Sequence, residues 1–350
     1  MKKIFGNLLR FLLFAGIGVA ILYYVFHKQS IAYQAQCALD NVPIEKCSLV
    51  EKIITDYKDA NWGWLLLVWV AFFLSNVSRA YRWQMLIQPL GYKTKVSNGL
   101  WTILLGYFAN LGLPRMGEIV RASVMSKYEK IPVEKLIGTV VIDRIADSIT
   151  LLFIVGLTFL VEFDTLWSYL SNMMGNNQGG SGKVVMIGLI IFLIIGFFIF
   201  RKLLPTLRKY AIFQKIEKIF QGFLEGFSTI KNLKNPGLFI FHSLFIWLMY
   251  YLMLYFCFLS FAPTAHLGLE AALMVFVFGT FGMVIPSPGG MGTYHALIIA
   301  GLAIYGIAGQ DSFSLANIAF FTTQIFFCIL FGIIALIVLP IINRNYKIQS

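Results

Sequence analysis

Two arginines and a glutamate stand together in an otherwise apolar part of the sequence, in the stretch NLGLPRMGEIVR at Asn110–Arg121. Arg115, Glu118 and Arg121 follow one another at intervals of three, which places them on one side of a helix. Pro114 suits the first position of that helix, whose positive dipole end would then face a cavity inside the membrane. Because guanidinium groups bind phosphate well, this spacing predicts a phosphate site.

A second set of charges lies in VIDRIADSIT, at Val141–Thr150. Asp143 and Asp147 are four residues apart on one helix face, and Arg144 precedes Asp147 by three. Ionisable residues inside a membrane span are costly and usually face the interior of a helix bundle. With the charges of the first stretch, the set holds three arginines and three carboxylates, so it could neutralise itself.

Two interpretations of this balanced set stay open. In one, the charges form an ion-pair network that only holds neighbouring helices together. In the other, they coordinate a substrate, because Arg79 and Arg82, at the inner end of the preceding helix, leave surplus positive charge near the inner mouth. That surplus would attract a phosphate-bearing headgroup. Uptake of a proton by Asp143 or Asp147 during transport is a further hypothesis.

The hydrophobic sequence breaks a second time at VIPSPGGMGTYH, residues 284–295. Two prolines interrupt the chain there, and three glycines free its backbone. The residues concerned are Pro286, Pro288, Gly289, Gly290 and Gly292. The glycine N–H groups would form an anion-binding nest at a helix start, and Gly117 would supply a backbone donor at the first break. His295 lies one turn further on, where a lone histidine is more often structural than titrating.

The composition predicts a membrane protein. The chain of 350 residues is 59% hydrophobic and 13% charged, whereas soluble proteins carry about 25% charged residues. Several apolar runs approach or exceed the roughly 20 residues that span a bilayer. They are Leu12–Phe26, Leu65–Leu74 (longer if Trp62 and Trp83 lie at the two interfaces), Leu136–Val161, Val184–Phe200, Leu238–Ala262 and Ile318–Ile342. The first run is long for a signal peptide and no clear A-x-A site follows, so we expect a retained helix.

The net charge of +12 comes from cations in short loops between apolar runs. This is the positive-inside pattern rather than a nucleic-acid-binding surface. It predicts a multi-pass protein of the plasma (cytoplasmic) membrane, the inner membrane, with both termini cytoplasmic. Segment 27–61 has no cation excess, so we expect an outer loop with a small ordered cap or amphipathic piece, in which Cys37 and Cys47 could form a disulfide. The basic segment 201–235 would lie on the anionic inner leaflet or pack on protein.

Loop charges also divide the chain into two halves with the same order of elements. Each half has two helices, then a hairpin that returns to the face it came from, and then a further helix. The first membrane repeat covers 1–162, an outer loop covers 163–182, and the second repeat covers 183–350. The two hairpins lie at about 99–125 and about 271–305 and enter from opposite faces. Inverted repeats with broken hydrophobic segments are typical of transporters.

Short sequence matches fall at mirrored positions in the two hairpins. GYF at Gly106–Phe108 is similar to GTF at Gly279–Phe281, and PRMG at 114–117 is similar to GGMG at 289–292. The first hairpin's limbs have 13 residues each, about 20 Å of helix, which is less than the roughly 30 Å bilayer core. We therefore expect an all-α integral membrane protein, a polytopic helical bundle with inverted-topology repeats and two opposed re-entrant helical hairpins. Two full spans would also return to the same face.

Common enzyme signatures are missing from the sequence. It contains no P-loop, no Rossmann fingerprint, no H-E-x-x-H and no G-x-S-x-G, which are the motifs of phosphate, dinucleotide, zinc-protease and serine-hydrolase chemistry. We therefore expect neither an enzyme nor a cofactor or metal site. A further hypothesis is an intramembrane lipid-modifying enzyme that uses the Asp143/Asp147 pair. The missing motifs count against it.

Three motifs in order resemble the lysylphosphatidylglycerol synthase transmembrane region, also called the flippase-like family. They are LPRMGEIVRASVM at Leu113–Met125, VIDRIADSITLL at Val141–Leu152 and PSPGGMG at Pro286–Gly292. The Arg82–Trp83 pair is similar to that family too. The resemblance extends over most of the chain, roughly from residue 62 to residue 340.

The resemblance implies movement of a lipid between leaflets. In fused relatives the cargo is an aminoacylated phospholipid made by a separate synthase domain, which is absent from this sequence, so we expect no lipid synthesis. Standalone members are thought to serve polyprenyl-phosphate sugar or other lipid pathways. The family pattern has a glutamate about three residues after GGMG, where this chain has His295, which implies a different cargo.

The sequence therefore predicts a flippase-like lipid transporter that moves a phosphate-bearing lipid through a central polar cavity. Its expected partners are membrane lipids with anionic or phosphate-bearing headgroups, a second copy of the chain or a lipid-modifying enzyme, and no nucleic acid. The alternative is a non-transporting accessory subunit of a lipid- or polyprenyl-phosphate-modifying enzyme. Under that alternative, the isolated chain would not move lipid.

Overall fold

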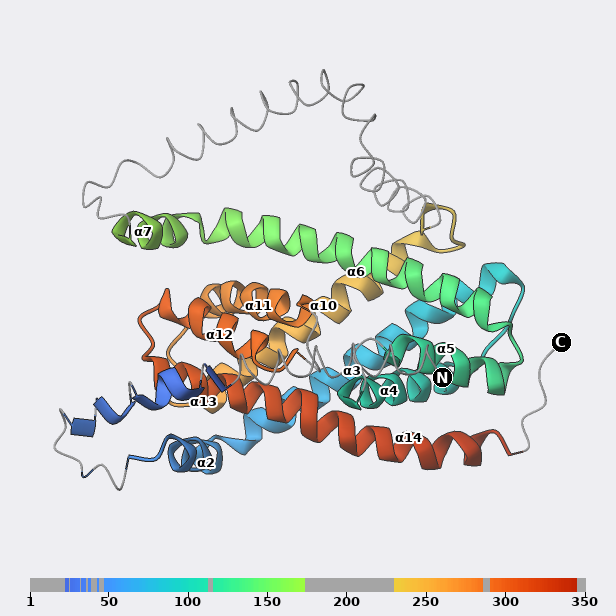
Figure 1. Ribbon diagram of the computed structural model, residues 1–350. Coiled ribbons are helices and arrows are strands. Elements are labelled where there is room, and N and C mark those ends of the chain that lie inside the picture. Colours follow the sequence, from blue (N-terminus) through green and yellow to red (C-terminus); the bar gives the residue numbers. More distant parts are fainter. Residues whose placement is uncertain are drawn as a thin grey trace, which may run out of the picture. The chain divides into compact units, whose positions relative to one another are not determined.

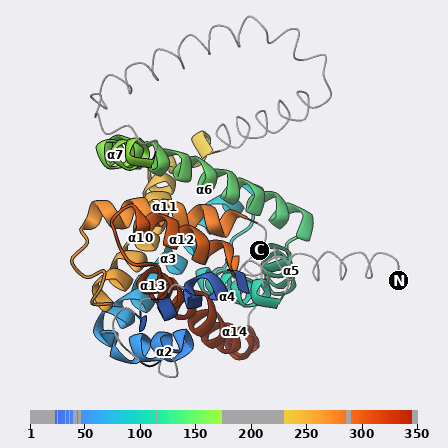
Figure 2. The same ribbon diagram turned by 60° about the vertical axis from the view of Figure 1, so that its left-hand side comes forward.

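The computed structural model describes residues 23–24, 26–31, 33–35, 37–38, 43, 47–112, 116–173, 230–285 and 290–344. Regular structure within these residues is helical throughout, and no strand occurs among them. The expectation of an all-α protein is therefore confirmed. Figures 1 and 2 show the helices from two directions.

Four of the described helices are long and apolar enough to cross a membrane. The first, Trp62–Leu90, comprises α3 (Trp62–Ile87) and the short η2 (Gln88–Leu90), and it contains both tryptophans expected at its ends. The others are α6 (Val133–Val161), α10 (Pro236–Ser260) and the continuous helix Gly309–Ile342. These lengths confirm a membrane protein with several spans, and the direction in which each span crosses stays a prediction. Run Val184–Phe200, most of Leu12–Phe26 and segment 201–229 lie outside the described residues.

The chain forms two compact units. The first comprises Met1–Arg144 together with Gly237–Ser350, and the second comprises Ile145–Pro236. In the second unit, the segment expected as an outer loop begins with an 11-residue helix, α7 (Phe163–Met173). Phe163 stacks on Trp167 one turn later in α7, with ring centroids 6.5 Å apart, so aromatic packing supports a helix in a segment that sequence polarity predicts as a loop.

In the first unit, α4 (Val96–Gly112) and α5 (Met116–Glu129) pack side by side as a helical hairpin. Gly106 and Gly117 face each other at the contact, and a Cβ atom at either position would collide with the other residue's carbonyl oxygen. The side-chain oxygen of Asn110 accepts a hydrogen bond from the Gly117 N–H at 2.7 Å. The two glycines therefore allow the close approach, and Asn110 satisfies a helix-start donor that would otherwise be unpaired.

A second hairpin of the first unit has the same construction. Helices α11 (Leu269–Val284) and α12 (Thr293–Ala303) lie side by side in both views (Figures 1 and 2). A Cβ atom at Gly279 or Gly282 would collide with α12, chiefly with Tyr294. The Thr293 hydroxyl donates a hydrogen bond to the Gly282 carbonyl at 2.7 Å. Again, glycines allow close approach and one polar side chain joins the two limbs.

The glycines that begin the matched triplets GYF and GTF occupy equivalent places in the two hairpins. Each faces the second helix of its hairpin: a Cβ atom at Gly106 would meet the backbone of α5, and one at Gly279 would meet side chains of α12. The first hairpin has helices of 17 and 14 residues and the second has helices of 16 and 11, or about 17–26 Å each. All four are shorter than a bilayer core of about 30 Å. The re-entrant depth and the inverted orientation of the hairpins stay predictions.

The long helix Gly309–Ile342 supports the first hairpin. It consists of α13 (Gly309–Phe320), the π-helical segment η4 (Phe321–Phe327) and α14 (Cys328–Ile342). Helix α14 lies along α4 (Figures 1 and 2), where Gly332 leaves room for the ring of Phe108. In the π-helical segment, the Thr322 carbonyl accepts a hydrogen bond from the Trp69 indole at 3.1 Å. A π-helix shifts the backbone hydrogen-bond register, so this carbonyl is available for a partner on α3.

Helix α2 (Leu49–Asp59) is the ordered, amphipathic piece expected in segment 27–61. Lys52 binds Asp56 at 2.7 Å and Asp311, at the start of α13, at 3.0 Å. Burial lowers the pKa of Lys52, but its hydrogen bonds and charge attraction to both aspartates outweigh this, and the pKa lies above its ordinary value. The attachment therefore persists at neutral pH and is lost only in strongly alkaline solution. Cys37 and Cys47, in the preceding segment, are joined by a disulfide.

Candidate functional site

Three arginine side chains converge on the carboxylate of Asp143. Arg79 donates to Oδ2 at 3.2 Å, Arg82 donates to Oδ1 at 2.6 Å, and Arg121 donates to Oδ2 at 3.0 Å. These four residues, the arginine cluster, come from α3, α5 and the part of α6 that lies in the first unit. The side chains expose between 0% and 4% of their area, so the cluster is buried.

Local sequence places each member of the cluster. Arg79 and Arg82 are three residues apart and therefore share one face of α3. The neighbouring Trp83 donates its indole N–H to the Thr139 hydroxyl at 2.9 Å. Thr139 lies one turn before Asp143 on α6, so this bond aligns the arginine face of α3 with the carboxylate. From α10, the Ser243 hydroxyl accepts a hydrogen bond from Arg82 at 3.1 Å.

Aromatic rings cover the guanidinium groups. Arg121 lies over the ring of Trp83, with 4.5 Å between its Cζ atom and the ring centroid. Arg82 lies over Phe239 at 5.7 Å. Such cation–π contacts are worth up to about 2 kcal/mol when they are shielded from water. They offset part of the cost of burying the three guanidinium groups.

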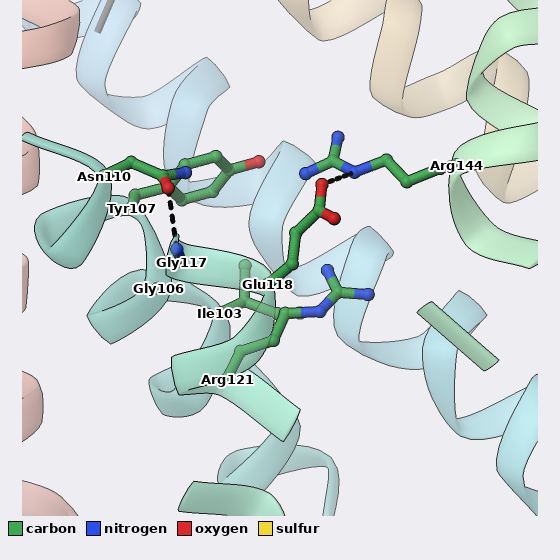
Figure 3. A pocket seen from close by; sticks show the side chains of 8 residues that line it. All are labelled: Ile103, Gly106, Tyr107, Asn110, Gly117, Glu118, Arg121 and Arg144. Atoms are coloured by element: carbon green, nitrogen blue, oxygen red, sulfur yellow. Dashed lines mark hydrogen bonds and ion pairs between the residues drawn. The ribbon is translucent and has the colours of Figure 1, made fainter. Parts of the chain in front are cut away.

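A small pocket opens beside the arginine cluster and is seen from close by in Figure 3. Its space is about 220 Å³ when the open mouth is counted, but the enclosed room is only about 10 Å³, about enough for one water molecule. The lining residues come from the first hairpin and from α6: Ile103, Gly106, Tyr107, Asn110, Gly117, Glu118, Arg121 and Arg144. A phosphate group would therefore have to take the place of a lining side chain.

Glu118 and Arg144 form an ion pair within the pocket lining (Figure 3). The Arg144 Nε atom donates to Glu118 Oε1 at 2.6 Å. The Arg144 side chain exposes 42% of its area and the Glu118 side chain exposes 40%, whereas Asp143 is buried. The pocket therefore has a solvent-accessible ion pair at its side and a buried cationic cluster behind it.

Tyrosine hydroxyls connect the pocket to the arginine cluster by a second route. Tyr107, which lines the pocket, shares a hydrogen bond with Tyr250 at 3.1 Å between their hydroxyl oxygens. Tyr250 in turn accepts a hydrogen bond from Arg79 at 3.3 Å. Arg121 belongs to both the pocket and the cluster. A charge that enters the pocket would therefore interact with Arg121 directly. It would also polarise the hydrogen bonds that lead through the two tyrosines to Arg79.

The expected site residues fall into five groups. Gly117, Glu118, Arg121 and Arg144 line the pocket, and Arg82 and Asp143 lie in the arginine cluster behind it. Asp147 lies one turn beyond Asp143 on α6, within the second unit. Pro114, Arg115, Pro286, Pro288 and Gly289 lie outside the described residues. Gly290, Gly292 and His295 belong to the second hairpin and are not among the pocket residues.

His295 packs among aromatic rings rather than toward the pocket. It is 1% exposed, and its ring centroid lies 4.9 Å from that of Phe320 and 5.9 Å from that of Phe313. The nearby Gly290 and Gly292 have φ angles of +80°, a conformation that glycine adopts readily. In this structure the second hairpin therefore contributes tight packing, and the polar pocket belongs to the first hairpin.

The charge pairing differs from the balanced set expected from sequence. Arg79 and Arg82, expected as surplus positive charge, are buried partners of Asp143. Sequence analysis also did not identify Tyr107 and Tyr250 as site residues. For the pairing of Arg79 and Arg82 with one carboxylate, the available signal was their interval of three, which places both on one helix face. Among the residues that the structure describes, no group of three or more His, Cys, Asp or Glu side chains could hold a metal ion.

Comparisons with known proteins agree with this architecture. The family model of the lysylphosphatidylglycerol synthase transmembrane region matches residues 48–332. A UPF0104 membrane protein of Methanocaldococcus jannaschii is 26% identical over 281 residues, which cover 74% of this chain and 80% of the relative. No solved structure matched the chain. The family match includes the first hairpin, the arginine cluster and the second hairpin.

Proposed function

Because the chain belongs to the family of the lysylphosphatidylglycerol synthase transmembrane region, we propose that it moves a phosphate-bearing lipid between membrane leaflets. The headgroup phosphate binds in the pocket of the first hairpin, next to Arg121 and Arg144, while the acyl or prenyl tails stay in the bilayer. The protein acts as a transporter rather than as an enzyme. It operates in the cytoplasmic membrane with both termini in the cytoplasm, as the loop charges favour.

The observation that carries this proposal is the concentration of arginines beside the pocket. Arg79, Arg82 and Arg121 bind the buried carboxylate of Asp143, and Arg121 and Arg144 line the pocket. Ionisable residues are costly inside a membrane protein and usually mark a substrate pathway. Guanidinium groups match the geometry and the charge of a phosphate ester.

Apolar surface near the pocket suits a ligand with lipid tails. Ile119 follows Glu118 in α5 and is 48% exposed, and Val141 precedes Asp143 in α6 and is 53% exposed. Exposed aliphatic side chains of this kind are expected where a membrane protein faces lipid tails. A headgroup in the pocket can therefore remain connected to tails outside it, which a closed pocket would forbid.

A transport assay tests the proposal. Purified protein in phosphatidylcholine vesicles that contain labelled phosphatidylglycerol should speed the exchange of label between leaflets. Arg144→Gln removes one pocket cation at a half-exposed position, so it should lower the rate about tenfold or more, as expected for loss of a charge-assisted hydrogen bond. The exposed Lys127 on α5 provides the matched control, because Lys127→Gln removes the same charge and should leave the rate unchanged.

Two results would contradict the proposal in different ways. Equal rates for the wild type and Arg144→Gln would separate transport from the pocket. No exchange by the wild type, with phosphatidylglycerol nevertheless retained on the purified protein, would favour the accessory-subunit alternative. In that case a lipid-modifying enzyme should co-purify with the chain from its native membrane.

A further inference from the structure

The two carboxylates near the pocket differ sharply in accessibility. Asp143 is fully buried and accepts hydrogen bonds from three arginines, whereas the Glu118 side chain is 40% exposed and pairs with Arg144. Removing a buried, multiply bonded carboxylate from its partners leaves uncompensated charge. A half-exposed pair can instead rearrange when another anion takes the place of its carboxylate. Asp143 is therefore a fixed counter-ion, and Glu118 is one that can exchange.

Glu118 also lies where an incoming anion would bind. Glu118 and Arg121 are three residues apart on α5, and both line the pocket together with Arg144 (Figure 3). The Arg121 side chain is only 4% exposed, and its Nε atom is buried without a hydrogen-bond partner. Buried donors in proteins are nearly always paired. Arg121 therefore keeps one donor for which the described residues supply no acceptor.

From this arrangement we propose that Glu118 is an internal competitor for the headgroup site. The phosphate of a lipid phosphodiester takes the place of the Glu118 carboxylate on Arg144, and Glu118 turns toward solvent. This inference rests on the proposed function and assigns a selectivity role within the same pocket. A phosphodiester carries one negative charge, as Glu118 does, so the exchange leaves the charge around Arg144 and Arg121 unchanged.

The competition has two consequences for transport. Weakly held anions cannot displace a carboxylate that is already in contact with Arg144, so only a ligand with additional contacts, such as lipid tails, occupies the pocket. The carboxylate also speeds release, because it re-forms its ion pair as the phosphate leaves. Removing the charge of Glu118 should therefore strengthen headgroup binding and slow turnover, which is the opposite of the effect of losing a binding residue.

The test compares lipid binding by wild type, Glu118→Gln and Arg144→Gln in phosphatidylcholine nanodiscs that contain a minor fraction of phosphatidylglycerol. Protein-associated phosphatidylglycerol should rise about fivefold or more in Glu118→Gln, as expected when a competing charge at contact distance is removed. It should fall in Arg144→Gln. Exchange of label in vesicles should slow in both variants. Glu134→Gln, at an exposed position of α6, makes the same charge change and should alter neither measurement.

The outcomes separate this inference from the function on which it rests. If the wild type enriches phosphatidylglycerol, Arg144→Gln loses it, and Glu118→Gln is unchanged or also loses it, Glu118 is not a competitor although the pocket binds headgroups. If the wild type shows no enrichment at all, both proposals fail. Glu118→Asp keeps the charge but shortens the side chain by one methylene, so intermediate retention is expected if contact with Arg144 matters.

The same chemistry could serve a free phosphate ion, and one further measurement distinguishes the two sources. Inorganic phosphate is added to lipid-free protein in detergent, with ionic strength held constant by chloride, and thermal unfolding is followed. Little stabilisation by phosphate, together with retention of phosphatidylglycerol in nanodiscs, supports a lipid headgroup. Strong stabilisation by phosphate that is greater in Glu118→Gln, without lipid retention, would assign the pocket to a free anion and overturn the proposal.

Discussion

Replacing Asp143 with asparagine is expected to destabilise the protein more than any other single change at the site. Asparagine has nearly the same shape, but it leaves Arg79, Arg82 and Arg121 without their shared negative charge in a buried place. Breaking a buried ion pair by neutralising one partner typically costs about 3–5 kcal/mol. Thermal unfolding in detergent should therefore occur at a temperature several degrees lower than in the wild type, or the variant should fail to fold.

A second substitution keeps this prediction testable if the single variant does not fold. Asp143→Asn combined with Arg82→Gln removes one of the positive charges that faced the carboxylate, so the double variant should be more stable than Asp143→Asn alone. Asp164→Asn, at an exposed position of α7, provides the control and should change the unfolding temperature little. An Asp143→Asn protein as stable as the wild type would mean that the arginine cluster does not depend on this carboxylate.

The substitution Gly117→Ala is expected to open the first hairpin and to disturb the pocket. A Cβ atom at this position would collide with the Gly106 carbonyl and with the Asn110 side chain. Added methyl groups in tightly packed places typically cost about 1–3 kcal/mol. Because Gly117, Glu118 and Arg121 share α5, a shift of this helix should also reduce lipid retention.

Gly138→Ala is the matched control for this prediction. Gly138 lies within α6, and a Cβ atom there would meet nothing within 4 Å. Alanine is favoured over glycine inside a helix by about 1 kcal/mol, so Gly138→Ala should be neutral or stabilising. In Gly117→Ala, the unfolding temperature and the retained phosphatidylglycerol should both decrease. In Gly138→Ala, neither quantity should decrease. Equal behaviour of the two variants would show that the close approach of α4 and α5 is not required.

Several elements could be predicted from sequence because their signal is local. The long apolar runs identify α3, α6, α10 and the helix Gly309–Ile342, since spanning helices need continuous hydrophobic sequence. The prolines and glycines near 114 and 286–292 predict two pairs of short helices, because such residues interrupt helical sequence, and the structure has α4 and α5 in one pair and α11 and α12 in the other. The polar segment before α3 was expected to hold an ordered amphipathic piece, which the structure shows as α2.

The ion pairing could not be predicted in the same way. Loop charges indicate on which side of a membrane a helix ends, so Arg79 and Arg82 were placed at an inner mouth. Their partner Asp143 is 64 residues from Arg79 and 61 residues from Arg82 in the sequence. Pairing over such distances depends on how α3 and α6 pack, and a single sequence does not encode this in any local pattern.

The helix content of 163–173 shows a similar limit. Glu162, Asp164 and the lack of a cation before Lys183 predict an outer loop over 163–182, whose Gly/Asn/Ser-rich part begins at Gly175, and the structure has α7 before that part. Phe163 and Trp167 are four residues apart and stack one turn apart on this helix. This interval between two aromatic residues is the signal for the helix in the sequence.

The most direct test of the account is mass spectrometry of the lipids that remain bound to the purified protein, compared between wild type and Arg144→Gln. We expect the wild type to be enriched in one class of phosphate-bearing lipid relative to the membrane from which it was purified, and the variant to lose that enrichment while remaining folded. Bound lipids that reflect the bulk membrane composition, unchanged by the substitution, would contradict a headgroup site in the pocket and leave the charges with a structural role alone.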